Sequence, residues 1–377
     1  MADAPSKKPK DTPFRQQNLK AWRPILTPNL VILLFLIVGV VFIPIGVAVL
    51  SASNDVIEIE SSDYSKHVDE GGCCEQNCGK SDPNRIDRNP CTISIEVPKQ
   101  MDPPIYMYYK LTNYYQNHRR YVKSRSDQQL RGLDTETELL KTSCQHRVYL
   151  NNSEDTDHEQ VINPCGLIAW SFFNDSFALK DETGTRVAGA DINNPFKKTT
   201  GVAWESDVNM KFKNSKVDSK SKTGDFFENF QFWRNQNCDQ YKTEFPLSPN
   251  ELIMTCRNAD AGWCFPGSGF CVEDQHFIVW MRTAGLPTFR KLYDKVEDMP
   301  LQPGKHSITI WNNDASGQKS KYLYPVHSFS GSKSIVLSTS SWIGGKNGFL
   351  GGAYLTVGII CLVLAAGFAA KVHFFPK

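Results

Sequence analysis

The chain has 377 residues, with 42 Lys and Arg against 40 Asp and Glu, so its formal net charge is only +2. This length suits two or three average domains, or one large all-β domain with additional segments. The near-neutral charge gives the whole chain no attraction to nucleic acid and argues against that class of partner.

The first predicted element is an apolar stretch from Leu30 to Ala52, preceded by a polar tail of residues 1–29. A membrane-spanning helix needs about 20 apolar residues, so the stretch is long enough to cross a bilayer. The tail is rich in Lys and Arg, whereas acidic residues follow the stretch, which predicts a cytosolic N-terminus. A cleaved signal peptide ending near residues 51–53 is the alternative, although the apolar run is long for one.

Residues 53–348 then lie outside the cytosol, and their pattern predicts short strands separated by turns. Alternating or β-branched and aromatic runs predict strands at residues 91–97, 105–111, 276–282, 306–311 and 334–339. Clusters of Pro and Gly separate them, and residues 211–224 read as a polar loop. Together these features predict an antiparallel β-sandwich ectodomain.

Ten of the eleven cysteines fall in this outside segment, and an even number suits a disulfide framework. The ten are Cys73, Cys74, Cys78, Cys91, Cys144, Cys165, Cys238, Cys256, Cys264 and Cys271. Zinc binding by the first four is the alternative, but their spacing is poor for it and the compartment is oxidising. Two N-x-Ser sequons, at Asn151 and Asn174, give weaker support for the same location.

Residues 113–126, NYYQNHRRYVKSRS, interleave tyrosines with basic residues. Read as a helix, the segment places Tyr114, Tyr115, His118, Tyr121 and Val122 on one face, toward the core. Arg119, Arg120 and Lys123 lie on the opposite face, which predicts a solvated surface or a docking surface for an acidic partner or lipid phosphates. Its location outside the cytosol disfavours nucleic acid as the partner.

Residues 181–185, DETGT, differ by one letter from the phosphorylated-aspartate motif of P-type ATPases. Glu182 replaces the motif's lysine, and the segment faces away from cytosolic ATP, so we interpret it as a polar turn with Gly184 in a permissive geometry. HExxH, GxSxG and Walker A patterns are absent from the sequence. We therefore predict no catalytic, cofactor or metal site.

A second apolar stretch, Phe349 to Ala370, returns the tail of residues 371–377 to the cytosol. Neither stretch carries an ionisable side chain, which disfavours a channel or transporter pore. Gly348 and Gly352 form a small-xxx-small pair, through which the spans pack on each other or on a partner's helix. An ectodomain tied at both ends suits an accessory subunit, with a stand-alone receptor or adhesion protein, or an ecto-enzyme, as alternatives.

Long stretches of the chain closely resemble the cell cycle control protein 50 family, called ALA-interacting subunits in plants. They cover the tail, both spans and most of the ectodomain in order: FRQQNLKAWRPILTP (14–28), YYQNHRRYVKSRSDQQLRG (114–132), NPCGLIAWSFFND (163–175), GVAWESD (201–207), FIVWMRTAGLPTFRKLY (277–293) and LSTSSWIGGKNGFLGGAYLTVG (337–358). The resemblance implies a non-catalytic β-subunit of a type-IV P-type ATPase, a phospholipid flippase. In such a heterodimer the ATPase hydrolyses ATP and moves the lipid, while the β-subunit supports its folding, exit from the endoplasmic reticulum and activity.

The resemblance also implies roles for particular residues. It implies a Cys144–Cys165 disulfide, nested Cys73–Cys91 and Cys74–Cys78 disulfides, and glycosylation at Asn174. The tail motif of Phe14, Gln16, Gln17, Leu19 and Trp22 is expected to lie near the partner on the cytosolic side. The protein itself is expected in membranes of the endoplasmic reticulum, the Golgi and endosomes, or the cell surface. Residues 208–275 depart from the family pattern, and their cysteines are expected to form two further disulfides. Asn151 has no clear family counterpart.

Overall fold

The computed structural model of this chain describes residues 11–19, 27–78, 84–133, 135–149, 163–189, 200–214, 271–311 and 323–374. Its described parts form two compact units. One contains both ends of the chain, within residues 1–55 and 347–377, and the other is the ectodomain, within residues 56–346. The predictions for Trp22, Asn151, Cys238, Cys256 and Cys264 lie outside the described residues, as does most of the predicted loop at 211–224.

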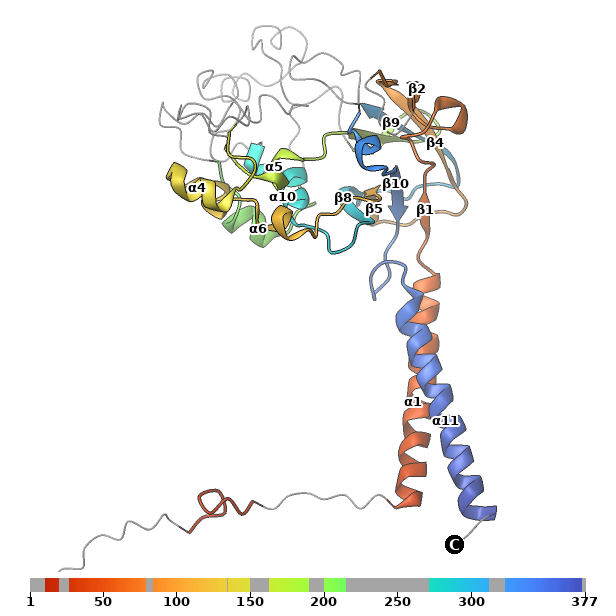
Figure 1. The fold of residues 1–377 in the computed structure, drawn as a ribbon. Helices are drawn as coiled ribbons and strands as arrows, with labels where there is room; N and C mark the ends of the chain where they lie inside the picture. The colour runs from red at the N-terminus through yellow and green to blue at the C-terminus, as the bar shows by residue number, and fades with distance from the viewer. Residues whose placement is uncertain are drawn as a thin grey trace, which may run out of the picture. The chain divides into compact units, whose positions relative to one another are not determined.

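Two long helices, α1 (Pro28–Asn54) and α11 (Gly348–Phe374), contain the two predicted apolar stretches (Figure 1). Both are long and apolar enough to cross a membrane. Thr27 caps α1, with its hydroxyl accepting a hydrogen bond from the N–H of Leu30, and Pro28 occupies the first turn, where its missing N–H costs nothing. The chain therefore has the two candidate membrane-spanning helices that its composition predicts.

The ectodomain contains two four-stranded sheets, and all of their strand pairings are antiparallel. The first has the order β1-β10-β5-β8, the second β4-β9-β6-β7, and a separate hairpin joins β2 to β3. Their bounds are β1 Glu58–Glu60, β2 Cys74–Gln76, β3 Ile86–Asp87, β4 Cys91–Val97, β5 Ile105–Leu111, β6 Ser176–Lys180, β7 Arg186–Gly189, β8 Phe289–Val296, β9 Gly304–Trp311 and β10 Lys333–Ser338. The predicted antiparallel architecture is confirmed.

Short helices fill the connections between the strands of the described ectodomain. They are α2 Arg119–Lys123, α3 Asp127–Leu130, α4 Thr137–Ser143, α5 Leu167–Trp170, α6 Glu205–Met210 and α10 Gln275–Met281, with 3₁₀ turns at Val68–Glu70, Cys271–Glu273 and Val326–Phe329. Figure 1 shows α4, α5, α6 and α10 gathered on one side of the ectodomain.

The strand predicted at residues 276–282 is wrong, because residues 276–281 belong to helix α10 (Gln275–Met281). Asp274 caps this helix by accepting a hydrogen bond from the N–H of His276, 2.7 Å away. Phe277, Ile278, Trp280 and Met281 are buried, a spacing that matches a helical face and not an alternating strand. The β-branched and aromatic residues of this segment favour a strand, but packing against neighbouring elements overrides that preference and the segment is helical.

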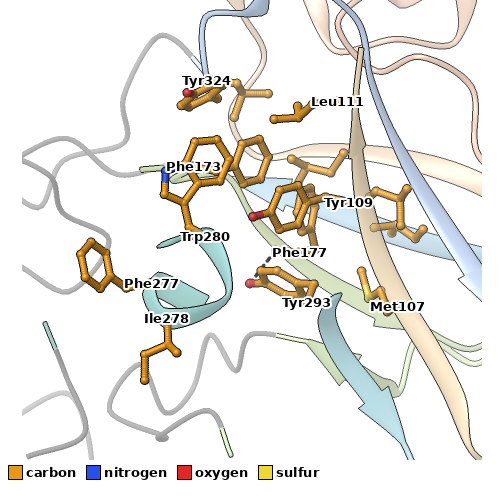
Figure 2. Close-up of a cluster of buried hydrophobic side chains, with 14 of the residues drawn as sticks. Met107, Tyr109, Leu111, Phe173, Phe177, Phe277, Ile278, Trp280, Tyr293 and Tyr324 are labelled. Atoms are coloured by element: carbon orange, nitrogen blue, oxygen red, sulfur yellow. Dashed lines mark hydrogen bonds between the residues drawn. The ribbon is translucent and has the colours of Figure 1, made fainter. Parts of the chain in front are cut away.

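Aromatic side chains build much of the core, as Figure 2 shows. Tyr109 of β5 stacks on Phe173 with ring centroids 4.2 Å apart, and Phe177 of β6 lies edge-on to Tyr293 of β8 at 4.9 Å. These rings join the two sheets, and Trp280 brings α10 onto the same cluster, where it is fully buried. Buried aromatic contacts of this kind dominate the apolar area of a core.

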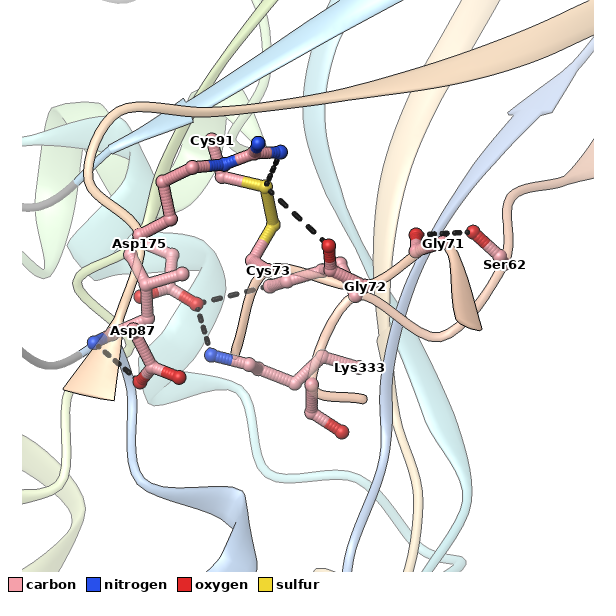
Figure 3. Close-up of a disulfide and its surroundings, with 12 residues drawn as sticks. Ser62, Gly71, Gly72, Cys73, Asp87, Cys91, Asp175 and Lys333 are labelled. Atoms are coloured by element: carbon pink, nitrogen blue, oxygen red, sulfur yellow. Dashed lines mark hydrogen bonds and ion pairs between the residues drawn. A yellow bond between two sulfur atoms is a disulfide. The ribbon is translucent and has the colours of Figure 1, made fainter. Parts of the chain in front are cut away.

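A buried group of charges lies beside the Cys73–Cys91 disulfide (Figure 3). The Lys333 ammonium is 2.8 Å from the Asp175 carboxylate, which also accepts a hydrogen bond from the Tyr64 hydroxyl. Arg85 pairs with Asp87 in the same way, at 2.8 Å. All four charged side chains are buried, so each needs its partner to offset the loss of water.

Candidate partner-binding surfaces

The segment from Asn113 to Ser126 is helical only over Arg119–Lys123, a single turn. The helix predicted over residues 113–124 is confirmed only for this last turn, so the angular assignment, which assumed a helix throughout, fails. Tyr114 and Tyr121 are half-buried as expected, whereas Tyr115, His118 and Val122 are exposed. Asn113 has a positive φ of 56°, which is not a helical conformation and marks a turn at the start of the segment.

Hydrogen bonds fix this segment to the loop after α10. Gln116 is fully buried, and its side-chain carbonyl accepts a hydrogen bond from the N–H of Ala284 at 2.9 Å. Asn117 donates to the carbonyl of Gly285 at 2.9 Å, and the N–H of Tyr114 donates to Pro287 at 2.9 Å. Residues 114–117 and 284–287 therefore form one continuous support, although 168 positions separate Gln116 from Ala284.

The two inward tyrosines bind this support to the core. The ring of Tyr114 meets Phe329 and Trp280 edge-on, with centroids 5.0 and 5.7 Å apart. The Tyr121 hydroxyl lies 2.8 Å from that of Ser171, and burial raises the pKa of Tyr121 well above its usual value. Both tyrosines are thus structural residues that hold α2 in place.

A second exposed group lies on α6 and the end of α10. Asp207 of α6 is buried and pairs with Arg282 and with Lys211, and the hydrogen bond from Arg282 lowers the pKa of that carboxyl. The Arg282 guanidinium lies over the indole of Trp204, 4.8 Å from its centroid. Trp204 itself is 68% exposed, which is a large apolar area to leave in water.

These contacts connect α2, the 284–287 loop and α6, and we call their exposed residues the α2–Trp204 surface. It consists of Tyr115, Arg119, Arg120, Lys123, Trp204, Arg282 and Leu286. Among the residues described, Arg119, Arg120 and Lys123 make no ion pair or side-chain hydrogen bond. Free cations beside exposed aromatic and aliphatic groups form a surface suited to a protein partner with acidic side chains.

The described part of the N-terminal tail forms a compact turn. The N–H of Gln16 donates to Thr12 at 2.9 Å and that of Asn18 donates to Pro13 at 2.8 Å, while Gln17 adopts a φ of 54°. Phe14 is 77% exposed and Leu19 is 62% exposed. The turn thus presents two apolar side chains that nothing in the described chain covers.

The glycines that hold α1 against α11 differ from the predicted pair. A Cβ built on Gly39 or Gly46 of α1 would lie within 3.0 Å of Leu362 or Leu355, and one on Gly351 or Gly358 of α11 would meet Leu50 or Ile43 as closely. A Cβ on Gly348 would make only an ordinary 3.6 Å contact with Leu50, and one on Gly352 would meet nothing within 4 Å. Gly348 and Gly352 are therefore not required for this packing and remain a prediction for a partner's helix.

Three disulfides join Cys73 to Cys91, Cys74 to Cys78 and Cys144 to Cys165, which are the pairs that the family resemblance implies. For Cys271 only the backbone is described. Asn174 is half-buried two residues before β6, between the buried residues Phe173 and Asp175.

The DETGT segment is the turn that joins β6 to β7. One oxygen of Asp181 accepts hydrogen bonds from the N–H groups of Thr183 and Thr185, at 2.9 and 2.8 Å, and from the Thr183 hydroxyl, which lowers the pKa of this carboxyl. Gly184 has a φ of 83°, as the interpretation of a polar turn requires. Within the described ranges no group of three His, Cys, Asp or Glu residues has the geometry to hold a metal.

Comparison with known proteins decides the family. Residues 35–377 match the LEM3 (ligand-effect modulator 3) / CDC50 family. The chain belongs to this family. It is 41% identical over 373 residues to ALA-interacting subunit 3 of Arabidopsis thaliana, and this match covers 99% of this chain and 88% of the relative. It is 38% identical over 371 residues to cell cycle control protein 50A of Mus musculus, and this match covers 96% of this chain and 88% of the relative. It is also 32% identical over 393 residues to phospholipid-transporting ATPase accessory subunit CRF1 of Saccharomyces cerevisiae, covering 99% and 87%.

Sequence reasoning on this CDC50-family chain found the basic residues of the α2–Trp204 surface and missed its other half. Trp204, Arg282 and Leu286 lie in the stretches GVAWESD and FIVWMRTAGLP, which were noted only as family signatures. Two local signals were available: Trp204 stands next to acidic residues, which are usually exposed, and Leu286 stands in a Gly-Leu-Pro sequence typical of a turn. Neither shows that the first stretch contacts the second, or that the second contacts residues 114–117, because these contacts are the tertiary interactions of Asp207 with Arg282 and of Gln116 with Ala284.

Proposed function

We infer that this chain is the accessory β-subunit of a type-IV P-type ATPase that transports phospholipids across a membrane. The names of its relatives support this, since one is an accessory subunit of a phospholipid-transporting ATPase and another an ALA-interacting subunit. The partner hydrolyses ATP and moves the lipid. This chain is non-catalytic, binds no cofactor, and supports the folding, export from the endoplasmic reticulum and activity of the ATPase.

The observation that carries the proposal is the α2–Trp204 surface. Its three cations have no partner among the described residues, while hydrogen bonds join the 114–117 and 284–287 segments that support them. The shape of the surface is therefore fixed, and its charges are available to a partner. Residues Arg119, Arg120 and Lys123 bind acidic loops of the ATPase on the non-cytosolic side, with Trp204 as the apolar anchor beside them. An aromatic side chain next to an arginine is a frequent centre of binding energy.

The remaining contacts follow the topology in which both termini are cytosolic. The tail residues Phe14, Gln16, Gln17, Leu19 and Trp22 bind the ATPase on the cytosolic side, and Gly348 with Gly352 admits one of its helices. Asn174 carries the glycan. The heterodimer works in the endoplasmic reticulum, Golgi, endosomal and plasma membranes, where it maintains lipid asymmetry.

The test is purification of the tagged full-length chain in mild detergent, followed by quantification of the ATPase that accompanies it. The variant R119E/R120E/K123E is expected to lose the ATPase, because acidic side chains then face acidic loops. K66E/K99E/K305E is the matched control, since it makes the same change in net charge at exposed lysines elsewhere. Equal recovery of ATPase with both variants contradicts the assigned surface.

The alternatives predict different results in the same preparation. A receptor or adhesion protein purifies without an ATPase and binds its ligand through the ectodomain alone. An ecto-enzyme shows turnover with the purified ectodomain. Lipid-stimulated ATP hydrolysis that requires this chain supports the subunit and neither alternative.

A further inference from the structure

A short turn follows β10, and its tip is an exposed tryptophan. The N–H of Ser341 donates to the carbonyl of Gly344 at 2.8 Å, and the N–H of Gly344 donates back to Ser341 at 2.9 Å. The Ser341 hydroxyl adds a third bond to Gly344 and accepts one from the N–H of Ile343. Gly344 has a φ of 114°, which favours glycine. The turn is therefore a fixed structure, with Trp342 and Ile343 at its centre.

Trp342 is 80% exposed, more than any other tryptophan in the described residues. Each of the other described tryptophans is buried or contacts another side chain or backbone group. Trp311 is buried, and Trp280 donates a hydrogen bond to the carbonyl of Ile168 at 2.8 Å. The guanidinium groups of Arg147 and Arg282 lie over the rings of Trp170 and Trp204. The indole N–H of Trp342 donates to no group that the structure describes, and its ring meets no other described ring. A rigid turn that presents such a side chain offers an apolar ring and an N–H donor to a surface outside the described chain.

The ectodomain holds the turn from two sides. The N–H of Thr339 donates to Ile57 at 3.0 Å, and the N–H of Ile57 donates to the Thr339 hydroxyl at 3.0 Å, so β10 and β1 stay paired beyond their ends. A Cβ on Gly345 would lie 3.3 Å from the guanidinium of Arg290, whose charge is paired with Glu58 at 2.7 Å. The turn that carries Trp342 is thus held in place by β1 and β10, the first and last strands of the ectodomain.

The covalent chain limits how far this turn can lie from the spans. Only residues 55–57 separate α1 from β1, and only residues 343–347 separate Trp342 from the first residue of α11. At about 3.5 Å per extended residue, these connections reach at most about 14 and 21 Å. Helices of 27 residues are about 40 Å long and exceed a hydrocarbon core of about 30 Å, so their ends already enter the headgroup layer.

We propose that the Trp342 turn inserts into the headgroup layer of the non-cytosolic leaflet and anchors the ectodomain to the bilayer surface. The indole ring suits the boundary between acyl chains and headgroups, where its N–H finds an ester or phosphate oxygen. Lys346 is exposed in the same connection, and its ammonium suits a lipid phosphate. This anchor depends on the two spans and not on any ATPase, so it goes beyond the function proposed above.

Fluorescence quenching in nanodiscs tests the proposal on the full-length chain. The discs contain lipids brominated either near the carbonyl end of the acyl chain or near its terminal methyl. We expect quenching by the shallow bromines that falls in W342F and is unchanged in W204F, the matched change at the other highly exposed tryptophan. Trp342 is exposed, so W342F is expected to keep the unfolding midpoint of the wild type. Shallow quenching that is equal in W342F and wild type overturns the proposal.

A second measurement separates lipid from protein as the occupant of the turn. In discs that hold the chain together with its co-purified ATPase, the Trp342-dependent quenching is expected to persist. The variant W342E is expected to co-purify as much ATPase as the wild type. Loss of the quenching when the ATPase is present, or loss of ATPase from W342E, assigns the turn to the protein interface and overturns the membrane anchor. Because the first measurement uses the chain alone, its result does not depend on whether the flippase assignment holds.

Discussion

Two regions of the ectodomain differ in whether their positively charged side chains are buried and paired or exposed and without a partner among the described residues. Beside the Cys73–Cys91 disulfide, Lys333 and Arg85 are buried and each meets a carboxylate at 2.8 Å. On α2, Arg119, Arg120 and Lys123 are exposed, and within the described chain none has a partner. In the first arrangement each ion depends on its partner, because either one alone would be buried without compensation. The second adds little to the fold and leaves the charges available for a partner.

The largest expected effect comes from breaking the buried pair. Asp175→Ala leaves the Lys333 ammonium buried without its carboxylate, and we expect the free energy of unfolding to fall by about 3–5 kcal/mol. Denaturant titration of the purified chain measures it. The double variant D175L/K333M is the control, since removing both charges avoids the uncompensated ion. A double variant that is less stable than Asp175→Ala would show that the pair is not an interdependent unit.

The Cys144–Cys165 disulfide lies next to the end of α2. The Ser124 hydroxyl, at the end of α2, donates to Gln145 and accepts from the N–H of Leu167, so both sides of the bridge contact α2. We expect C144A/C165A to lose about 2–4 kcal/mol of stability. Faster hydrogen exchange is expected at residues 119–124, while the amides of β4 are protected as in the wild type. Uniform loss of protection in both places would contradict independent support of the surface.

Lys291 is an intermediate case, buried like Lys333 but held by carbonyl oxygens. Its ammonium donates to Val279, Trp280 and Arg282 at the end of α10, and burial lowers its pKa to about 7. The unfolded side chain has a pKa of about 10.4, so between these values the unfolded chain binds one more proton. Stability should therefore rise with pH above about 7, by about 1 kcal/mol per pH unit.

Unfolding midpoints between pH 7 and 9 check this prediction for Lys291. The isosteric variant K291M is expected to lose the pH dependence in this range. A pH slope that is unchanged in K291M would show that another group titrates.

The smallest effect on stability is expected on α2. R119E/R120E/K123E should change the free energy of unfolding by no more than about 0.5 kcal/mol, because exposed and unpaired side chains contribute little. Thermal unfolding of the purified chain measures this, with K66E/K99E/K305E as the matched control. A loss of several kcal/mol would place these cations in the fold and remove the contrast with Lys333.

The sequence correctly predicts four strands, two from alternation and two, at residues 306–311 and 334–339, from β-branched and aromatic content. β4 and β5 bury every second residue, and both were predicted with their observed bounds. β6 buries four consecutive residues and β1 has only three, so neither has a period that can be read. Helix α10 was predicted as a strand, because its letters favour β structure and only its packing against α5, α6 and β8 makes it a helix.

The α2–Trp204 surface likewise contains residues that a local sequence pattern reveals and residues that only tertiary contacts bring together. Arg119, Arg120 and Lys123 are adjacent in sequence, so a local pattern is enough to find them. Arg282 reaches Asp207 across 75 positions, and Gln116 reaches Ala284 across 168, so the contribution of Trp204 and Leu286 depends on tertiary structure. The outward direction of Tyr115 depends on one positive φ at Asn113, which no periodicity shows.

The most direct test of the central claim is quantitative mass spectrometry of the full-length chain purified in mild detergent, combined with ATP hydrolysis by the same preparation. If this chain is the β-subunit, a type-IV P-type ATPase is expected in equal amount, with lipid-stimulated hydrolysis that disappears when this chain is omitted and falls in R119E/R120E/K123E but not in K66E/K99E/K305E. A chain that is stable, folded and free of any ATPase would contradict it.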